Sequence, residues 1–348
     1  MNIVILIVTF CFAESIVRVF DYVFVDRPKG LIGLYYNHNS VISRRPTSTN
    51  YFGFNEDYDY TKEIPAGKSR IIFIGDSYTF GSGTSREKSY CEVVENHLNT
   101  NSNIEYEIFN AGVPGYSLFE TNKMFHFLKN EGYQYDAIVL SIFLQNDLTD
   151  YIKRTYRKAA CGFIQRFPQN IFLRHFHPLN SYIFRFGAVA FVYFKIQHII
   201  KSEAEREQAR ADEPTDTNGE YRINPITYVR LERNYLRSAN HDLDDMYAYI
   251  SSIAEACDSP FYVVIIPDQF YGHEAVRQRV LQAVDANEYD FLVFYNWIND
   301  QLKEFVLLDV TEVIQNCSDC YIDNDMHLND KGNKVLGEAV GKFLLDQE

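Results

Sequence analysis

Apolar runs and amphipathic segments alternate along most of the chain. Ile71 to Ile74 is an unbroken, β-branched apolar run with the length of a buried parallel strand, and similar runs recur downstream. The pattern predicts strands at 69–76, 104–110, 137–144, 261–266 and 306–310. Apolar positions spaced as on one face of a helix predict helices at 85–99, 118–130, 240–257, 275–284, 291–301 and 330–345. Strands that alternate with helices indicate a parallel sheet with crossover helices.

Two segments interrupt this alternation. Residues 26–68 are rich in Tyr, Asn, Gly, Pro and Ser, which predicts an extended lead-in with turns. Residues 151 to about 230 carry many aromatic and basic side chains, and we interpret them as a largely helical insertion into an α/β domain at 69–348. Within the insertion, Ser181 to Ile200 is largely apolar, but its charged residues favour a buried amphipathic helix over a membrane span.

Residues 1–25 form a hydrophobic, anchor-like or signal-like segment. Its apolar run, Ile3 to Ala13, has the length of a signal-peptide core and is too short for a full membrane span. No Lys or Arg precedes the run and no small-residue cleavage site stands out, whereas Glu14 and Arg18 can pair across one helical turn. These features predict an uncleaved anchor or an interfacial helix. The alternative is an apolar helix packed on the globular domain.

Composition narrows the choice of partners. The 348-residue chain has a net charge of -14 and a pI of about 5.1, which argues against nucleic-acid binding through a basic surface.

Of six cysteines, only Cys317 and Cys320 have suggestive spacing, and one C-x-x-C supplies too few ligands for a structural zinc site. A local disulfide, as found outside the cytosol, and two unpaired thiols both remain open. No metal site is expected at the histidines of the insertion, which lack a matching carboxylate cluster: His175, His177 and His198.

The first predicted strand ends at Gly75-Asp76-Ser77, where a nucleophile could stand. A serine at the carboxyl end of a parallel strand lies on the rim where open α/β sheets bind ligands. Its hydroxyl is a weak nucleophile and needs a base. The candidate base is His327, and Asp325 would hold the imidazole in one tautomer and stabilise its charged form.

Two later strand ends supply donors suited to an oxyanion. The backbone N–H of Gly112 and the side-chain amide of Asn146 are of suitable types, as is the backbone N–H of Ser77. Gly112 also permits close backbone approach, because it has no Cβ. The structural alternatives are a plain turn glycine at position 112 and a capping or turn asparagine at position 146.

Other residues of these segments have structural interpretations. Ser77 could instead cap a helix that follows the strand, and His327 could be a surface histidine before the last helix. We expect Asp76 to bond backbone amides around the turn rather than to act chemically. We expect Asn329 to be the N-cap of the final helix.

Taken together, these segments resemble the four sequence blocks of the SGNH (GDSL-type) hydrolase superfamily. The blocks are Gly75-Asp76-Ser77, Asn110-Ala111-Gly112, Asn146-Asp147, and Asp325 with His327. The resemblance covers roughly residues 69–348. It implies a flavodoxin-like three-layer α/β/α sandwich with a central parallel sheet. It also implies a Ser–His–Asp site made of Ser77, His327 and Asp325, an oxyanion hole made of Gly112 and Asn146, and no metal or organic cofactor.

Two positions depart from the family pattern. Gln145 stands where a glycine is common, which affects the local backbone more than the role of Asn146. The acid usually stands three residues before the histidine, but position 324 is Asn and Asp325 is one residue closer. A similar D-x-H-[W/L]-N pattern occurs in the branch that resembles polysaccharide O-acetyltransferases and acetylesterases. Asp323 is the reserve choice for the acid.

The sequence therefore predicts a serine esterase that hydrolyses an acyl ester, acetyl above all, on a carbohydrate or cell-envelope glycan. We expect an extracytoplasmic bacterial protein, in the periplasm or at the cell surface, that is membrane-anchored through residues 1–25 or secreted. Two alternatives stay open. One is an O-acyltransferase that uses the same groups. The other is a non-catalytic glycan-binding or envelope-assembly protein, in which Ser77, His327 and Asp325 would not come within hydrogen-bond reach.

Overall fold

The chain divides into two compact units. The computed structural model describes residues 9, 12, 15, 50, 53–144, 147, 243–283, 291–322 and 325–347, and the backbone of 155–160 and 163–168. The larger unit comprises the described residues within 41–153 and 222–348. The smaller unit contains the antiparallel hairpin of β4 (Thr155–Ala160) and β5 (Phe163–Pro168).

Five parallel strands form the sheet of the larger unit. They are β1 (Lys68–Gly75), β2 (Glu105–Gly112), β3 (Ala137–Phe143), β6 (Phe261–Ile266) and β7 (Val306–Asp309). Their order across the sheet is β2–β1–β3–β6–β7. This is the doubly wound order of flavodoxin-like folds, in which ligands bind at the carboxyl ends of the strands. The predicted fold class is therefore confirmed.

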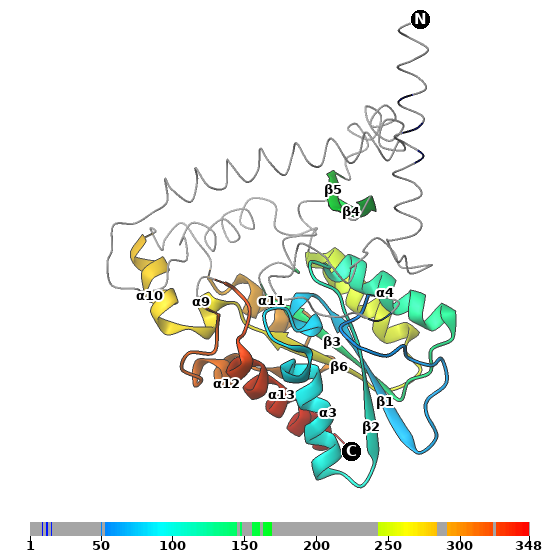
Figure 1. Cartoon of the computed structure of the whole chain (residues 1–348). Helices are drawn as coiled ribbons and strands as arrows, with labels where there is room; N and C mark the ends of the chain where they lie inside the picture. The colour runs from blue at the N-terminus through cyan, green and yellow to red at the C-terminus, as the bar shows by residue number, and fades with distance from the viewer. Residues whose placement is uncertain are drawn as a thin grey trace, which may run out of the picture. The chain divides into compact units, whose positions relative to one another are not determined.

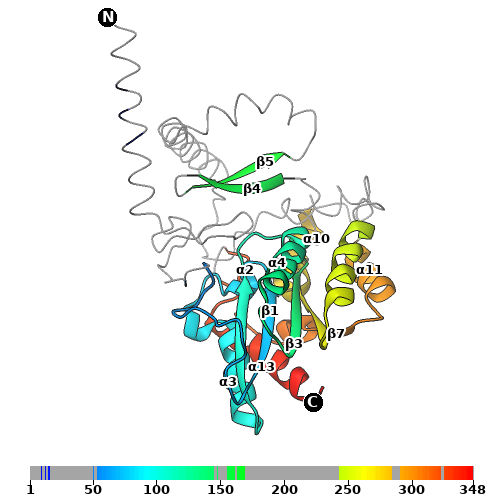
Figure 2. The same ribbon diagram turned by 90° about the vertical axis from the view of Figure 1, so that its right-hand side faces the viewer.

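Helices cover both faces of the sheet, as Figures 1 and 2 show. On one face, α3 (Tyr90–Asn101) packs against α13 (Asp330–Leu345). This pair approaches closely because Gly337 has no side chain: a Cβ there would lie 2.5 Å from Cβ of Val93. On the other face, α4 (Leu118–Glu131) packs against a helix over 243–256. Asn122 of α4 donates its side-chain amide to the carbonyl of Tyr249 at 3.1 Å. Because both faces are covered, β3 and the second half of β1 are almost continuously apolar.

Short helices and loops complete the unit around the strand ends. They are α2 (Ser77–Phe80), a 3₁₀ turn (Arg86–Lys88), α9 (Gln269–Gly272), α10 (Glu274–Ala283), α11 (Val293–Gln301) and α12 (Thr311–Gln315). The helix predicted at 85–99 begins later, at Tyr90, because the side chain of Ser89 caps it by accepting the N–H of Glu92. The sequence did not predict α9, α12 or the hairpin.

Side chains satisfy the backbone groups along the free edge of β2. The hydroxyl of Tyr60 donates to the carbonyl of Ile108 and accepts the N–H of Asn110, both at 3.1 Å. The carboxylate of Glu95 accepts the N–H of Ile108 at 2.7 Å. An edge strand with free backbone groups is a template for pairing with another chain, and these contacts occupy it. Tyr60 comes from the predicted lead-in at 26–68, so the described part of that segment packs on the sheet.

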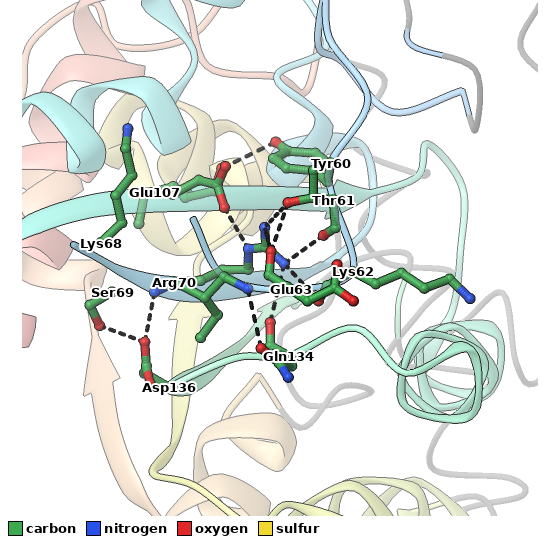
Figure 3. A network of polar contacts seen from close by, with 12 residues as sticks. Tyr60, Thr61, Lys62, Glu63, Lys68, Ser69, Arg70, Glu107, Gln134 and Asp136 are labelled. Carbon is green, nitrogen blue, oxygen red and sulfur yellow. Dashed lines mark hydrogen bonds and ion pairs between the residues drawn. The ribbon is translucent and has the colours of Figure 1, made fainter. Parts of the chain in front are cut away.

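Arg70 links three segments near the amino end of β1 (Figure 3). Its side chain is fully buried and forms an ion pair with Glu107 of β2. The guanidinium also donates to the carbonyls of Thr61 at 2.8 Å and Glu63 at 3.1 Å, and to that of Gln134 at 3.3 Å. Arg70 thus holds the described lead-in and the loop after α4 against the sheet.

Several predictions fall largely on residues outside the described part. These are the hydrophobic segment at 1–25, of which three positions are described, and the predicted helix at 181–200. The described part of the predicted insertion is the β4–β5 hairpin. Within the described residues, no helix has both the length and the apolar character needed to cross a membrane.

Candidate active site

Ser77 stands on a tight turn between β1 and α2. The strand ends at Gly75, and Asp76 is the N-cap of α2: its carboxylate accepts the N–H of Tyr78 at 2.9 Å. The expected structural role of Asp76 is thus confirmed, and Ser77 is the first helical residue rather than the cap. The Ser77 residue is 7% exposed. The turn therefore fixes its hydroxyl at the carboxyl end of the sheet.

A second turn carries Asp325 and His327 towards Ser77. An antiparallel bridge between Tyr321 and Leu328 closes the base of this turn, whose described residues, 321, 322 and 325–328, we call the acid–base turn. Above the bridge, the N–H of Ile322 donates to the carbonyl of His327 at 2.9 Å. The chain then enters α13, whose N-cap is Asn329 as predicted. The cap fixes where the acid–base turn ends.

The structure brings Ser77, His327 and Asp325 together. Nε2 of His327 lies 2.9 Å from Oγ of Ser77, and Nδ1 lies 2.6 Å from Oδ1 of Asp325. The backbone N–H of His327 also donates to Oδ1 at 3.0 Å. With the short D-x-H spacing, one carboxylate oxygen accepts hydrogen bonds from both the ring and the backbone of the histidine. The reserve acid, Asp323, lies outside the described residues.

The predicted oxyanion donors are only partly described. Gly112 ends β2 directly opposite Gly75, beside the turn that carries Ser77. Its N–H donates to the side-chain oxygen of Asn110 at 3.0 Å. Asn146 lies outside the described residues. The role of Gly112 and Asn146 as an oxyanion hole therefore stays a prediction.

Two side chains that the sequence analysis missed contact the acid–base turn. The hydroxyl of Tyr78 donates to the carbonyl of Met326, and the side-chain amide of Gln269 donates to the carbonyl of Asp325 at 2.8 Å. Both acceptors are backbone atoms, which no residue pattern reveals. The position of Tyr78, next to Ser77, was the one available signal.

Burial changes the acid–base behaviour of a neighbouring carboxyl. Asp268 follows β6 and is the N-cap of α9, where its side chain accepts the N–H of Tyr271 at 3.1 Å. Loss of solvation raises the pKa of Asp268 to about 7, against the opposing effect of hydrogen bonds from the N–H groups of Tyr271 and Phe270. Burial thus favours the neutral form of Asp268.

No group of His, Cys, Asp and Glu side chains among the described residues could hold a metal ion.

Cys317 and Cys320 form a disulfide just before the acid–base turn. Of the two possibilities left open by the sequence, the structure has the bonded one. Asn329 fastens the disulfide loop to α13, since its side-chain amide donates to the carbonyl of Asp319 at 2.7 Å and to that of Tyr321 at 3.0 Å. The start of the acid–base turn is thereby fixed on two sides.

Comparison with solved structures returns hydrolases at low identity. A lipase, Lip_vut3, from a goat rumen metagenome is 11% identical with a TM-score of 0.42, over 79% of this chain and 97% of its own. The psychrotrophic esterase EstA from Pseudoalteromonas sp. is 9% identical with a TM-score of 0.39, over 80% and 98%. A carbohydrate acetylesterase family member from Sinorhizobium meliloti is 10% identical with a TM-score of 0.35, over 79% and 97%.

Comparison by sequence gives a clearer result. No curated protein matches the chain. Residues 71–340, in contrast, match the family described as GDSL-like Lipase/Acylhydrolase. The match begins in β1, ends in α13 and so includes Ser77 and His327. The chain therefore belongs to the GDSL-like lipase/acylhydrolase family of ester hydrolases.

Proposed function

We propose that this GDSL hydrolase is a serine esterase with Ser77 as nucleophile, His327 as general base and Asp325 as the acid that orients it. The observation that carries the proposal is the relay of two short contacts, 2.9 Å from Oγ of Ser77 to Nε2 of His327 and 2.6 Å from Nδ1 to Asp325. Both distances lie within hydrogen-bond reach without a bound substrate. They favour the catalytic proposal over a non-catalytic protein that keeps the fold.

The geometry suggests the following sequence of steps. Oγ of Ser77 attacks the ester carbonyl while its proton passes to Nε2 of His327. Asp325 accepts a hydrogen bond from Nδ1–H and stabilises the imidazolium that forms. The tetrahedral intermediate then expels the alcohol, which takes the proton from Nε2, and leaves an acyl ester on Ser77. Water, deprotonated by His327, attacks that ester. The bond between the acyl carbon and Oγ breaks, His327 returns the proton to Oγ of Ser77, and the carboxylic acid is released.

The oxyanion hole of this proposal consists of Gly112 and Asn146, with the N–H of Ser77. In the structure the N–H of Gly112 is bonded to Asn110. To stabilise the oxyanion, this N–H must donate to the oxyanion as well as to Asn110, or in place of it, when the tetrahedral intermediate forms. Preorganised donors of this kind are each worth roughly 10²–10³ in kcat.

Replacing Gly112 by Ala is expected to lower kcat by about 10²-fold. A Cβ at position 112 would lie 2.3 Å from the backbone N of Phe80 and 2.5 Å from the backbone C of Thr79, both in α2. Both are backbone atoms of the helix that carries Ser77, so relief of the clash displaces α2 relative to the end of β2, and a displacement of about 1 Å costs that much. Steady-state hydrolysis of p-nitrophenyl acetate measures the effect.

Gly132→Ala is the matched control for Gly112→Ala. Gly132 has a φ of +83°, and a Cβ there meets nothing within 4 Å. Its replacement strains the backbone without touching α2, so kcat should stay within twofold of the unchanged protein. A Gly112→Ala protein with the same kcat as this control would contradict the predicted displacement.

The proposed substrate is a short-chain acyl ester, acetyl above all, on a carbohydrate or cell-envelope glycan. The Asp325-Met326-His327-Leu328-Asn329 segment supports this, through its resemblance to the acetylesterase and O-acetyltransferase branch. The disulfide at Cys317 and Cys320 and the hydrophobic segment at 1–25 support a site of action outside the cytosol, on a secreted or membrane-anchored chain.

An O-acyltransferase is the second candidate. It would form the same acyl ester on Ser77 and pass the acyl group to a sugar hydroxyl instead of water. The Asp325-Met326-His327-Leu328-Asn329 segment supports this candidate too, because the branch that it resembles includes O-acetyltransferases. The two candidates differ only in which acceptor reaches the acyl ester.

Chain-length preference tests the proposal. The full-length protein is incubated with p-nitrophenyl acetate, butyrate and octanoate, and with an acetylated xylo-oligosaccharide. We expect kcat/KM to be highest for acetate and at least about 10-fold lower for octanoate, since a short-acyl site excludes extra methylenes. A preference for octanoate would overturn the acetyl assignment. Folded protein that cleaves no ester, but moves acetyl to an added oligosaccharide, would establish the transferase instead.

A further inference from the structure

Tyr78 and Gln269 reach the acid–base turn from opposite parts of the chain. Tyr78 lies in α2, next to Ser77, and Gln269 is the first residue of α9, which follows β6. Tyr78 donates its hydroxyl to the carbonyl of Met326. Gln269 donates its side-chain amide to the carbonyl of Asp325 at 2.8 Å. Two consecutive carbonyls of the acid–base turn are therefore each bonded by a side chain from elsewhere in the unit.

These two donors are themselves rigidly placed. Tyr78 is 4% exposed, and its ring stacks on Phe143 of β3 with centroids 4.2 Å apart. Gln269 is 1% exposed and follows the capping Asp268 directly. A buried side chain in a single packed position makes a more precise anchor than a surface side chain. The acid–base turn itself is less buried, because the side chains of Asp325 and His327 are 44% and 20% exposed.

Such anchors are needed because the three site residues stand on two separate elements of the unit. Oγ of Ser77 lies 2.9 Å from Nε2 of His327, which takes its proton, and Nδ1 lies 2.6 Å from Asp325, which orients the ring and stabilises its charged form. Asp325 and His327 stand on one short turn, whereas Ser77 belongs to a separate helix. Any rotation of the acid–base turn would lengthen the contact between Nε2 and Oγ while leaving the internal contact to Asp325 intact. The cap at Asn329 and the bridge between Tyr321 and Leu328 fix the two ends of the turn, whereas Asp325 and His327 stand between those ends.

We propose that Tyr78 and Gln269 are positioning residues. They hold the backbone of Asp325 and Met326, and so keep Nε2 of His327 within hydrogen-bond distance of Oγ of Ser77. The inference rests on the proposed Ser–His–Asp mechanism. Tyr78 links the acid–base turn directly to the nucleophile, because it follows Ser77 in the chain. The centroid of its ring also lies 5.5 Å from the centroid of the His327 ring. Gln269 ties the same turn to the end of β6. Neither residue touches the substrate in this proposal.

Two substitutions remove the donors and keep the shapes. Tyr78→Phe deletes the hydroxyl and retains the ring stacked on Phe143. Gln269→Met keeps the length of the side chain and removes its N–H groups. Each should lower kcat for p-nitrophenyl acetate by about 10-fold with KM unchanged, and the double variant by about 10²-fold. The rate at which a p-nitrophenyl alkylphosphonate labels Ser77 should fall in parallel, because labelling also needs the base.

The chain offers matched controls for both donors. The hydroxyl of Tyr271, in α9, donates to the carbonyl of Phe291 at 2.6 Å, and the amide of Gln315 donates to the carbonyl of Tyr271 at 2.7 Å. Neither bond involves the acid–base turn. Tyr271→Phe and Gln315→Met should therefore keep kcat and the labelling rate, whatever they do to the unfolding midpoint.

The results separate this inference from the proposed mechanism. Slower turnover and slower labelling in Tyr78→Phe and Gln269→Met, with normal controls and unchanged KM, would establish the positioning role. Unchanged kcat in both variants would overturn the positioning role and leave the mechanism intact. Equal loss of kcat in the variants and their controls would also overturn it, since stability alone would then explain the effect. An inactive parent protein would instead overturn the proposed mechanism.

Discussion

Ser77→Ala is expected to abolish ester hydrolysis and leave the fold intact. In Ser–His–Asp hydrolases, loss of the nucleophile alone lowers kcat by roughly 10⁶-fold. The Oγ atom of Ser77 contacts Nε2 of His327 at 2.9 Å and Oδ2 of Asp76 at 3.2 Å, and neither contact is needed for α2, which Asp76 caps through the N–H of Tyr78. Turnover of p-nitrophenyl acetate by the full-length chain, with circular dichroism to check folding, gives the result.

The strongest form of this experiment is a double-variant comparison. His327→Ala should lose about as much activity as Ser77→Ala, and the double variant should lose no more than either, because the two residues act as one unit. Ser85→Ala is the control, since Ser85 lies in the loop after α2 and its side chain makes no capping hydrogen bond. Multiplicative losses in the double variant, or an active Ser77→Ala protein, would rule out the proposed nucleophile and base.

The framework of this site could be predicted from sequence because it depends on residue type at strand ends. The apolar runs at Ile71 to Ile74 and Phe261 to Ile266 are buried strands, as their β-branched composition predicts. Short motifs mark both Ser77 and His327. Ser77 comes directly after a predicted strand, and His327 comes just before a predicted helix. Their meeting at 2.9 Å depends on the parallel sheet, which places Ser77 at its carboxyl edge, and on the acid–base turn, which carries His327 to that edge.

What the sequence did not reveal has a common physical cause. Tyr78 and Gln269 donate to backbone carbonyls, so their partners carry no side-chain signature. Tyr60 similarly bonds the backbone of β2 from a segment that composition alone marks as a lead-in. Arg70 stands at the start of an apolar run, where a solvated charge is the usual interpretation. Its burial depends on carbonyls distant in the sequence, which only the folded chain brings together.

Arg70→Met is expected to lower the free energy of unfolding of the larger unit by about 3–5 kcal/mol. Removing one partner of a buried ion pair leaves the other charge unpaired, and the cost is of that order. Here the loss also leaves the carbonyls of Thr61, Glu63 and Gln134 without the guanidinium that they share (Figure 3). Urea unfolding followed by fluorescence measures it, since the single tryptophan, Trp297, is buried in α11 of the same unit.

Two comparisons isolate the cause of this destabilisation. Lys334→Met removes an exposed ion pair with Glu338, at 3.8 Å on the surface of α13, and should change the free energy by no more than about 0.5 kcal/mol. Arg70→Met combined with Glu107→Leu should be more stable than Arg70→Met alone, because no buried carboxylate is then left unpaired. It should remain less stable than the unchanged protein, because the three carbonyls stay without a donor.

A single Arg70→Met change that costs no more than Lys334→Met would contradict a stabilising role for this network. Arg70 lies towards the amino end of β1 and Ser77 follows its carboxyl end, so kcat of the folded variant should be unchanged.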